Sequence, residues 1–100
     1  MKKIKKMVDS INDELHGAKE YAETAIEYKV LGDTVRYNDY KTMANQELTH
    51  ADALHKMAVE DIEALKKVYP DPPQSMLDKW NKSHKEYIEK YAWIKQMLAM

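Results

Sequence analysis

The chain has 100 residues, of which 44% are hydrophobic and 33% are charged, with only two glycines and three prolines. This composition is typical of one strongly helical globular domain and excludes a disordered chain. The absence of cysteine excludes disulfides and thiolate metal sites, and the balance of 16 basic against 17 acidic residues gives no positive excess for binding nucleic acid.

The sequence also gives no sign of a membrane or export segment. No apolar run is long enough to cross a membrane, and the basic start of the chain is not followed by the apolar stretch of a secretion signal. We therefore expect a cytoplasmic protein that binds neither membranes nor nucleic acids.

Two breaks divide the chain into three predicted helices. Gly32 suits the end of a helix, and Asp33 or Thr34 can cap the next one. The prolines of segment 70–73 form the second break, because proline cannot continue a helix. The second helix would be about 54 Å long, longer than a compact domain of this size, so we expect an oligomer. The prediction is one domain over 1–100, with helices near 4–31, 34–69 and 75–98 and a Pro-rich turn at 70–73.

Apolar residues recur at steps of three and four along the first two predicted helices, which places them on one face of each. Glu14 is the charged residue on the first stripe, and Glu47 interrupts the second near its middle. In the third helix His84 interrupts an aromatic and aliphatic line, and we expect it to pack at a helix–helix contact. The stripes are Ile4, Met7, Ile11, Glu14, Ala18, Tyr21 and Ala25, and Tyr37, Tyr40, Ala44, Glu47, Ala51, Leu54, Ala58, Asp61, Leu65 and Val68.

The two glutamates on facing stripes suggest a metal site. An inward carboxylate is costly unless it is paired, protonated or bound to a metal, and neither stripe contains Lys or Arg. His50 follows Glu47 by three residues and points inward with it, or nearly so. A Glu on one helix with Glu-x-x-His on the next is a half-site for two metals in helical bundles. We predict Glu14, Glu47 and His50 as ligands, with a second copy of the chain supplying the other half-site.

The spacing alone is weak evidence, because chance predicts roughly 0.7 acid-x-x-His pairs in a chain of this composition. Only one of the three pairs present lies on a stripe, so placement carries the prediction. The pairs are Asp13/His16, Glu47/His50 and Asp52/His55; the first and third fall off the stripes, and we expect His16 and His55 to be exposed.

These residues resemble a known family. Segment 44–51, Ala-Asn-Gln-Glu-Leu-Thr-His-Ala, resembles the second-helix Glu-x-x-His-Ala motif of the ferritin-like superfamily, and of rubrerythrin-type bundles in particular. Asp13-Glu14 followed by Tyr21 resembles the first-helix pattern, and the 33-residue step from Glu14 to Glu47 is similar to that of rubrerythrins. The resemblance covers 8–58, half of such a bundle, and is nearest to the short encapsulated type of ferritin.

The resemblance implies an all-α fold, in which a long antiparallel hairpin and a third C-terminal helix form a ferritin-like four-helix bundle by dimerisation. It implies a di-iron centre between the chains of a homodimer or higher homo-oligomer, with manganese or zinc as alternatives, that oxidises Fe(II) or consumes oxygen or peroxide. Tyr21 would hydrogen-bond a ligand carboxylate, and a protein shell stays open as a partner. The residues also leave open a metal-free, or structurally metal-bound, helical oligomerisation module without catalysis, and whether the third helix packs on its own chain.

Overall fold

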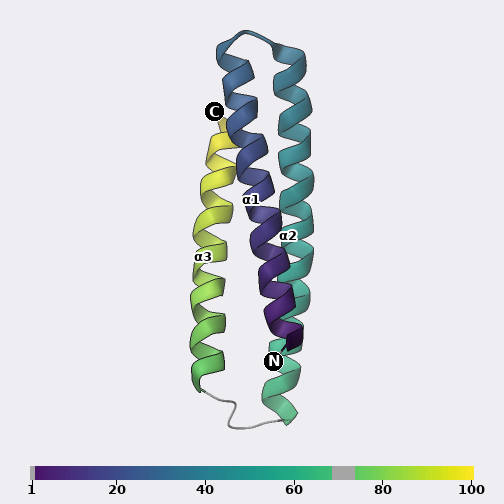
Figure 1. Ribbon diagram of the computed structural model, residues 1–100, viewed down its shortest axis with the longest axis vertical. Coiled ribbons are helices and arrows are strands. Elements are labelled where there is room, and N and C mark those ends of the chain that lie inside the picture. Colours follow the sequence, from purple (N-terminus) through teal and green to yellow (C-terminus); the bar gives the residue numbers. More distant parts are fainter. Residues whose placement is uncertain (1, 69–73) are drawn as a thin grey trace.

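The computed structural model describes residues 2–68 and 74–100, and these ranges contain three helices and no strand. The predicted Pro-rich turn at 70–73 lies outside the described residues. The helices lie side by side in a body of 56 × 18 × 17 Å (Figure 1), and none is long and apolar enough to cross a membrane. The helices are α1 (Lys2–Val30), α2 (Thr34–Val68) and α3 (Gln74–Ala99), each within two residues of its predicted bounds.

The turn between α1 and α2 is formed as the sequence predicts. Gly32 has a φ of +78°, in the left-handed region that a Cβ disfavours. Its N–H donates to the carbonyl of Lys29 at 3.1 Å, and the N–H of Asp33 donates to the carbonyl of Tyr28 at 3.0 Å, which closes α1. The Asp33 carboxylate accepts a hydrogen bond from the N–H of Arg36 at 3.0 Å. Asp33 is therefore the cap of α2.

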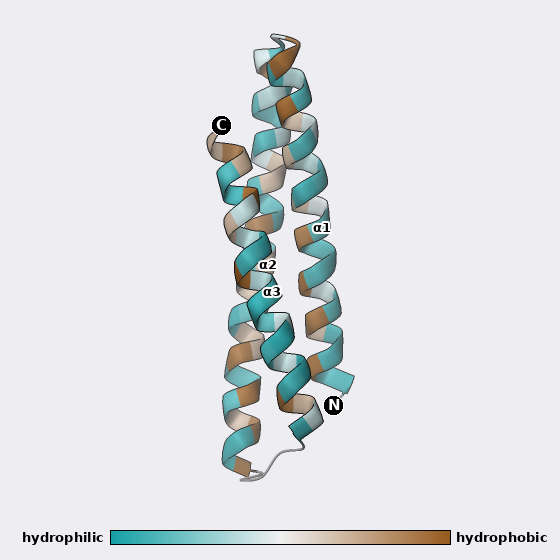
Figure 2. Ribbon diagram, turned by 90° about the vertical axis from the view of Figure 1, so that its left-hand side faces the viewer, coloured by the Kyte–Doolittle hydropathy of each residue, from teal (hydrophilic) through white to brown (hydrophobic). Residues whose placement is uncertain are grey.

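α1 and α2 pack along a seam of small residues, all but Ala22 of which lie on the predicted stripes, and Figure 2 shows the apolar bands recurring along the helices. Small side chains let two helix backbones approach closely, and Leu15 and Leu48 fill the space beside them. Val68, the last residue of the second stripe, is instead exposed, because α2 extends past the start of α1 (Figure 1). The alanines without any exposed surface are Ala18, Ala22, Ala44, Ala51 and Ala58.

α3 packs on the hairpin of its own chain, which answers the question that the sequence left open. Trp80, Tyr87 and Ile94 of α3 are buried in the same core as the hairpin residues. The backbone of α3 lies closer to α1 than to α2. Its contacts with α2 run through long side chains, such as Lys95 Nζ to Asn45 Oδ1 at 3.4 Å.

The hairpin therefore has one side covered by α3 and one side that α3 does not reach. On α1, Val8 and Asn12 line a hollow with α3, and Lys19 lies over the ring of Trp93 at 5.5 Å. At about 100° per residue, Glu14 lies on the opposite side of the buried line through Ala18. We call the uncovered side the open face; its residues include Glu14, Gly17 and Tyr21 on α1 and Met43, Glu47, His50, Leu54 and Met57 on α2.

Candidate metal centre

The open face brings the three predicted ligands together. Glu14 from α1 and Glu47 and His50 from α2 each offer a ligand atom, and these atoms all lie within 4.8 Å of one another. His50 Nδ1 is 3.6 Å from Glu14 Oε2. In 2–68 and 74–100, no other group of three or more acidic, histidine or cysteine side chains lies so close. The hairpin register alone, without α3, produces this cluster.

The cluster lies at the edge of the core. Glu14 and Glu47 are half-buried, whereas the side chain of His50 is 61% exposed. The prediction that His50 points inward with Glu47 is therefore wrong for the single chain. The reason is helical geometry, because His50 precedes the fully buried Ala51 by one residue and is rotated by about 100° from it.

The Glu14 carboxyl group affects the protonation of Glu47. A side-chain hydrogen bond with Glu14 raises the pKa of Glu47; burial and the Glu14 charge raise it further, while His50 lowers it. The neighbouring Glu14 therefore makes the charged form of Glu47 less favourable than in an isolated glutamate. A divalent cation placed between the two carboxylates would relieve that repulsion.

Gly17 leaves space for the Glu47 carboxylate. It lies in the interior of α1, where glycine costs up to about 1 kcal/mol relative to alanine. A Cβ at this position would lie 3.4 Å from Glu47 Oε2 and 3.6 Å from its carboxyl carbon. The glycine thus lies at a point of α1 that the Glu47 carboxylate approaches, where an alanine methyl would make van der Waals contact with it.

Tyr21 lies on the open face but away from Glu14, Glu47 and His50. Its ring packs against Tyr40 at a centroid distance of 6.1 Å, and Tyr40 stacks on Tyr28 at 5.5 Å. Among the hydrogen bonds of the described residues, none joins Tyr21 to Glu14 or Glu47. Tyr21 follows Glu14 by two helical turns, which separates them by about 10 Å along the axis.

The sequence reasoning missed a second polar cluster on the covered side. His16 is exposed as predicted, but the prediction of an exposed His55 is wrong. His55 is half-buried and stacks on the Tyr87 ring at a centroid distance of 4.0 Å. It follows the buried Ala51 by four residues, so it lies beside the seam, where the aromatic stripe of α3 packs against it. His84 lies at a helix–helix contact, as predicted.

Comparison of the chain with protein-family models, with curated proteins and with solved structures gives no match. The comparisons therefore neither support nor contradict the resemblance of segment 44–51 to ferritin-like proteins. The residues of the open face and their geometry are what point to a function.

Proposed function

We propose that this chain forms half of a two-metal carboxylate centre of the ferritin-like kind, completed by a second copy that docks on the open face. The observation that carries the proposal is the convergence of Glu14, Glu47 and His50 on a face that the chain does not itself cover. Two helices at fixed register provide the three groups, so the site does not depend on a mobile loop.

The donor set fits a divalent transition metal. Two carboxylates with one imidazole suit iron, manganese or zinc, and Glu14 and Glu47 supply the negative charge that such an ion balances. Gly17 places no side chain against the Glu47 carboxylate, which lies beside it. Iron held by these residues would supply redox chemistry toward Fe(II), oxygen or peroxide.

A second copy is the occupant of the open face that the site itself favours. One chain offers only two carboxylates and one imidazole, whereas a two-fold axis would bring two such sets together. Four carboxylates would then be neutralised by two divalent ions. Half-buried Met43 and Leu54, together with Met57, which is 45% exposed, border the ligands and provide apolar surface for such a contact.

The test measures bound metal and oligomeric state together. Purified chain is reconstituted anaerobically with Fe(II), Mn(II) or Zn(II), desalted, and examined by elemental analysis and analytical ultracentrifugation. We expect about one ion per chain in a dimer. The Glu47→Gln variant should lose most of the bound metal. Glu60→Gln, which removes one exposed carboxylate from the same helix, should keep it.

Two results would contradict the proposal in different ways. Equal and negligible metal in the wild type and in Glu47→Gln would remove the metal centre and leave a metal-free helical oligomerisation module. Metal bound stoichiometrically by a monomer would keep the site but remove the shared centre.

A further inference from the structure

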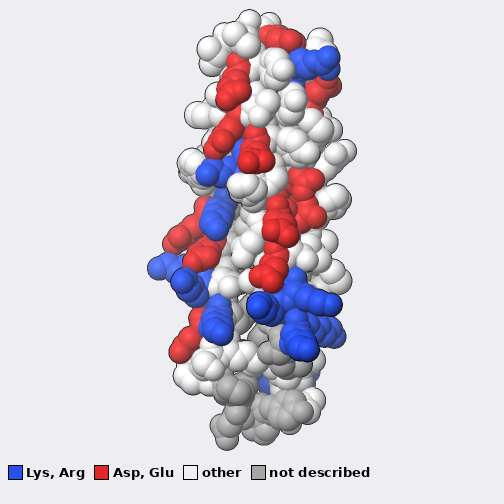
Figure 3. Space-filling model, in the orientation of Figure 1, with Lys and Arg blue, Asp and Glu red and all other residues white. Residues whose placement is uncertain are grey.

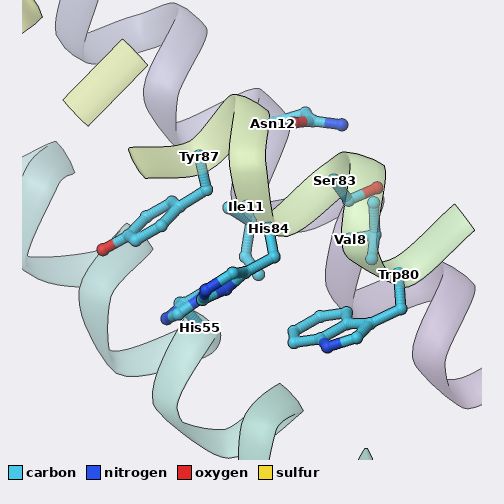
Figure 4. Close-up of a pocket in the computed structure, with 8 residues that line it drawn as sticks. All are labelled: Val8, Ile11, Asn12, His55, Trp80, Ser83, His84 and Tyr87. Atoms are coloured by element: carbon cyan, nitrogen blue, oxygen red, sulfur yellow. The ribbon is translucent and has the colours of Figure 1, made fainter. Parts of the chain in front are cut away.

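The covered side of the hairpin contains a pair of facing histidines that the proposed metal centre does not use. His55 Nε2 of α2 lies 2.8 Å from His84 Nδ1 of α3, a hydrogen bond in which one ring donates and the other accepts. Figure 4 shows the two rings meeting between the helices, with Trp80 and Tyr87 on either side. This bond is a direct polar link between α3 and α2.

The pair lies within an aromatic stack. The ring of His55 lies 4.0 Å from that of Tyr87 and 5.9 Å from that of Trp80, nearly parallel to both. Burial lowers the pKa of His55, and the neighbouring His84 lowers it further, while the charge of Asp52 partly opposes them. The folded chain therefore disfavours a charged His55.

The surrounding groups offer little compensation for added positive charge. On α2, Asp52 accepts a hydrogen bond from the Tyr87 hydroxyl of α3 at 3.1 Å. Burial, and then Asp52, raise the pKa of Tyr87, so that hydroxyl keeps its proton. The α1 residues that line the hollow beside the pair are Val8, Ile11 and Asn12, none of which titrates. Asp52 is thus the single acidic group facing the two imidazoles among the residues of these contacts.

We propose that the His55–His84 pair is a pH-sensitive clamp that holds α3 on the hairpin and releases it when both imidazoles are protonated. With no or one added proton, one facing nitrogen carries hydrogen and the other accepts it. With two, both facing nitrogens carry hydrogen, the acceptor is lost, and two positive charges lie in contact within a half-buried stack. Release exposes the apolar side of α1 beside Val8 and Ile11, while the α1–α2 seam and the open face remain.

The test follows the docking of α3 as a function of pH. Amide hydrogen exchange on the full chain gives protection factors, which remove the intrinsic effect of pH. Between pH 7.5 and 5.0, protection in α3 should fall by about tenfold or more. Protection at the centre of α1 and α2 should fall much less. In His84→Gln, whose amide can pair with His55 without becoming charged, the fall in α3 should be less than about twofold.

His16→Gln is the matched control, because His16 is exposed on α1 and pairs with Glu20 rather than with α3. It should behave as the wild type does. Unchanged protection of α3 in the wild type, or an equal fall in His84→Gln, would overturn the clamp. If α3 of His84→Gln is already undocked at pH 7.5, the clamp is tested in the wild type instead, by following the NMR ring resonances of His55 and His84 as a function of pH. Titration of both rings without release of α3 would overturn the clamp, and titration that coincides with release would support it.

Discussion

The α1–α2 hairpin has two broad sides, and the ionisable groups on them differ in the partners that the chain provides. On the covered side, His55 and His84 form a hydrogen-bonded pair under the aromatic residues of α3. On the open face, Glu14 and Glu47 oppose each other beside a largely exposed His50. In Figure 3, acidic and basic side chains alternate down the left-hand side of the molecule, and a group of basic side chains gathers toward the lower end, where Figure 1 places the N-terminus.

The difference shows what a covering helix does for polar groups. Where α3 supplies partners, each histidine of the pair has an acceptor or donor, and Asp52 has the Tyr87 hydroxyl. Where no helix covers the hairpin, the neighbouring Glu14 raises the pKa of Glu47, and no lysine or arginine of the described residues pairs with either carboxyl group. The polar groups of the covered side find partners within one chain, whereas on the open face a largely exposed His50 is the basic group beside the two carboxyl groups. This contrast is the physical basis of the proposal that a cation and a second copy belong there.

Truncation of a core side chain under α3 should have the largest effect on stability, and it tests the contrast between the covered side and the open face most directly. Ile94 is 1% exposed, and Ile94→Ala removes buried volume between α3 and the hairpin. We expect a loss of about 2–4 kcal/mol in the free energy of unfolding, measured by urea denaturation. Met57→Ala, on the open face, should cost less than about 1 kcal/mol in a monomer.

The concentration dependence of these two variants sharpens the comparison. If the open face docks a second copy, the cost of Met57→Ala grows with protein concentration in the presence of metal, whereas that of Ile94→Ala does not. A Met57→Ala cost that stays the same at all concentrations would argue against an interface on the open face.

Gly17→Ala should have an intermediate effect of the opposite sign. Alanine at this helix-interior position should raise the free energy of unfolding of the metal-free chain by up to about 1 kcal/mol. The added methyl would lie in van der Waals contact with the Glu47 carboxylate, 3.4 Å from Oε2, and would limit its rotation, so metal affinity should fall only slightly in the same variant. Calorimetric titration with Zn(II) measures that affinity. Higher stability with unchanged affinity would show that the glycine does not serve the site.

The sequence predicted the helices and the grouping of Glu14, Glu47 and His50 because both depend on local rules. Capping at Asp33 and the stripe with Glu14 and Glu47 follow from helix periodicity and from the antiparallel turn. The burial of His55 and the exposure of His50 depend on which side α3 covers. One sequence without a structure gives no information on that choice, because both residues lie beside the same buried line. The second copy is likewise outside what periodicity in one chain can establish.

The smallest expected effect is the pH dependence of the stability change caused by Glu47→Gln, measured in the presence of chelator. The pH dependence that Glu47 itself gives the wild type is opposite in sign to the one that His55 gives on the covered side. The pKa of Glu47 is raised above 4.5, so its stabilising contribution is present when it is protonated and is lost as pH rises through the folded value. Glutamine imitates the protonated form at every pH. The free energy of unfolding of the variant should therefore exceed that of the wild type at pH 7.5, by less than about 1 kcal/mol, and approach it as pH falls toward 4.5.

The pKa of His55 is lowered from 6.5, so its contribution to stability is lost as pH falls below that value. This His55 contribution is the same in both proteins, so it cancels when the unfolding free energy of the wild type is subtracted from that of the variant. Urea denaturation at pH 7.5 and 5.0 gives that difference, and a value independent of pH would show that the two carboxyl groups are not coupled.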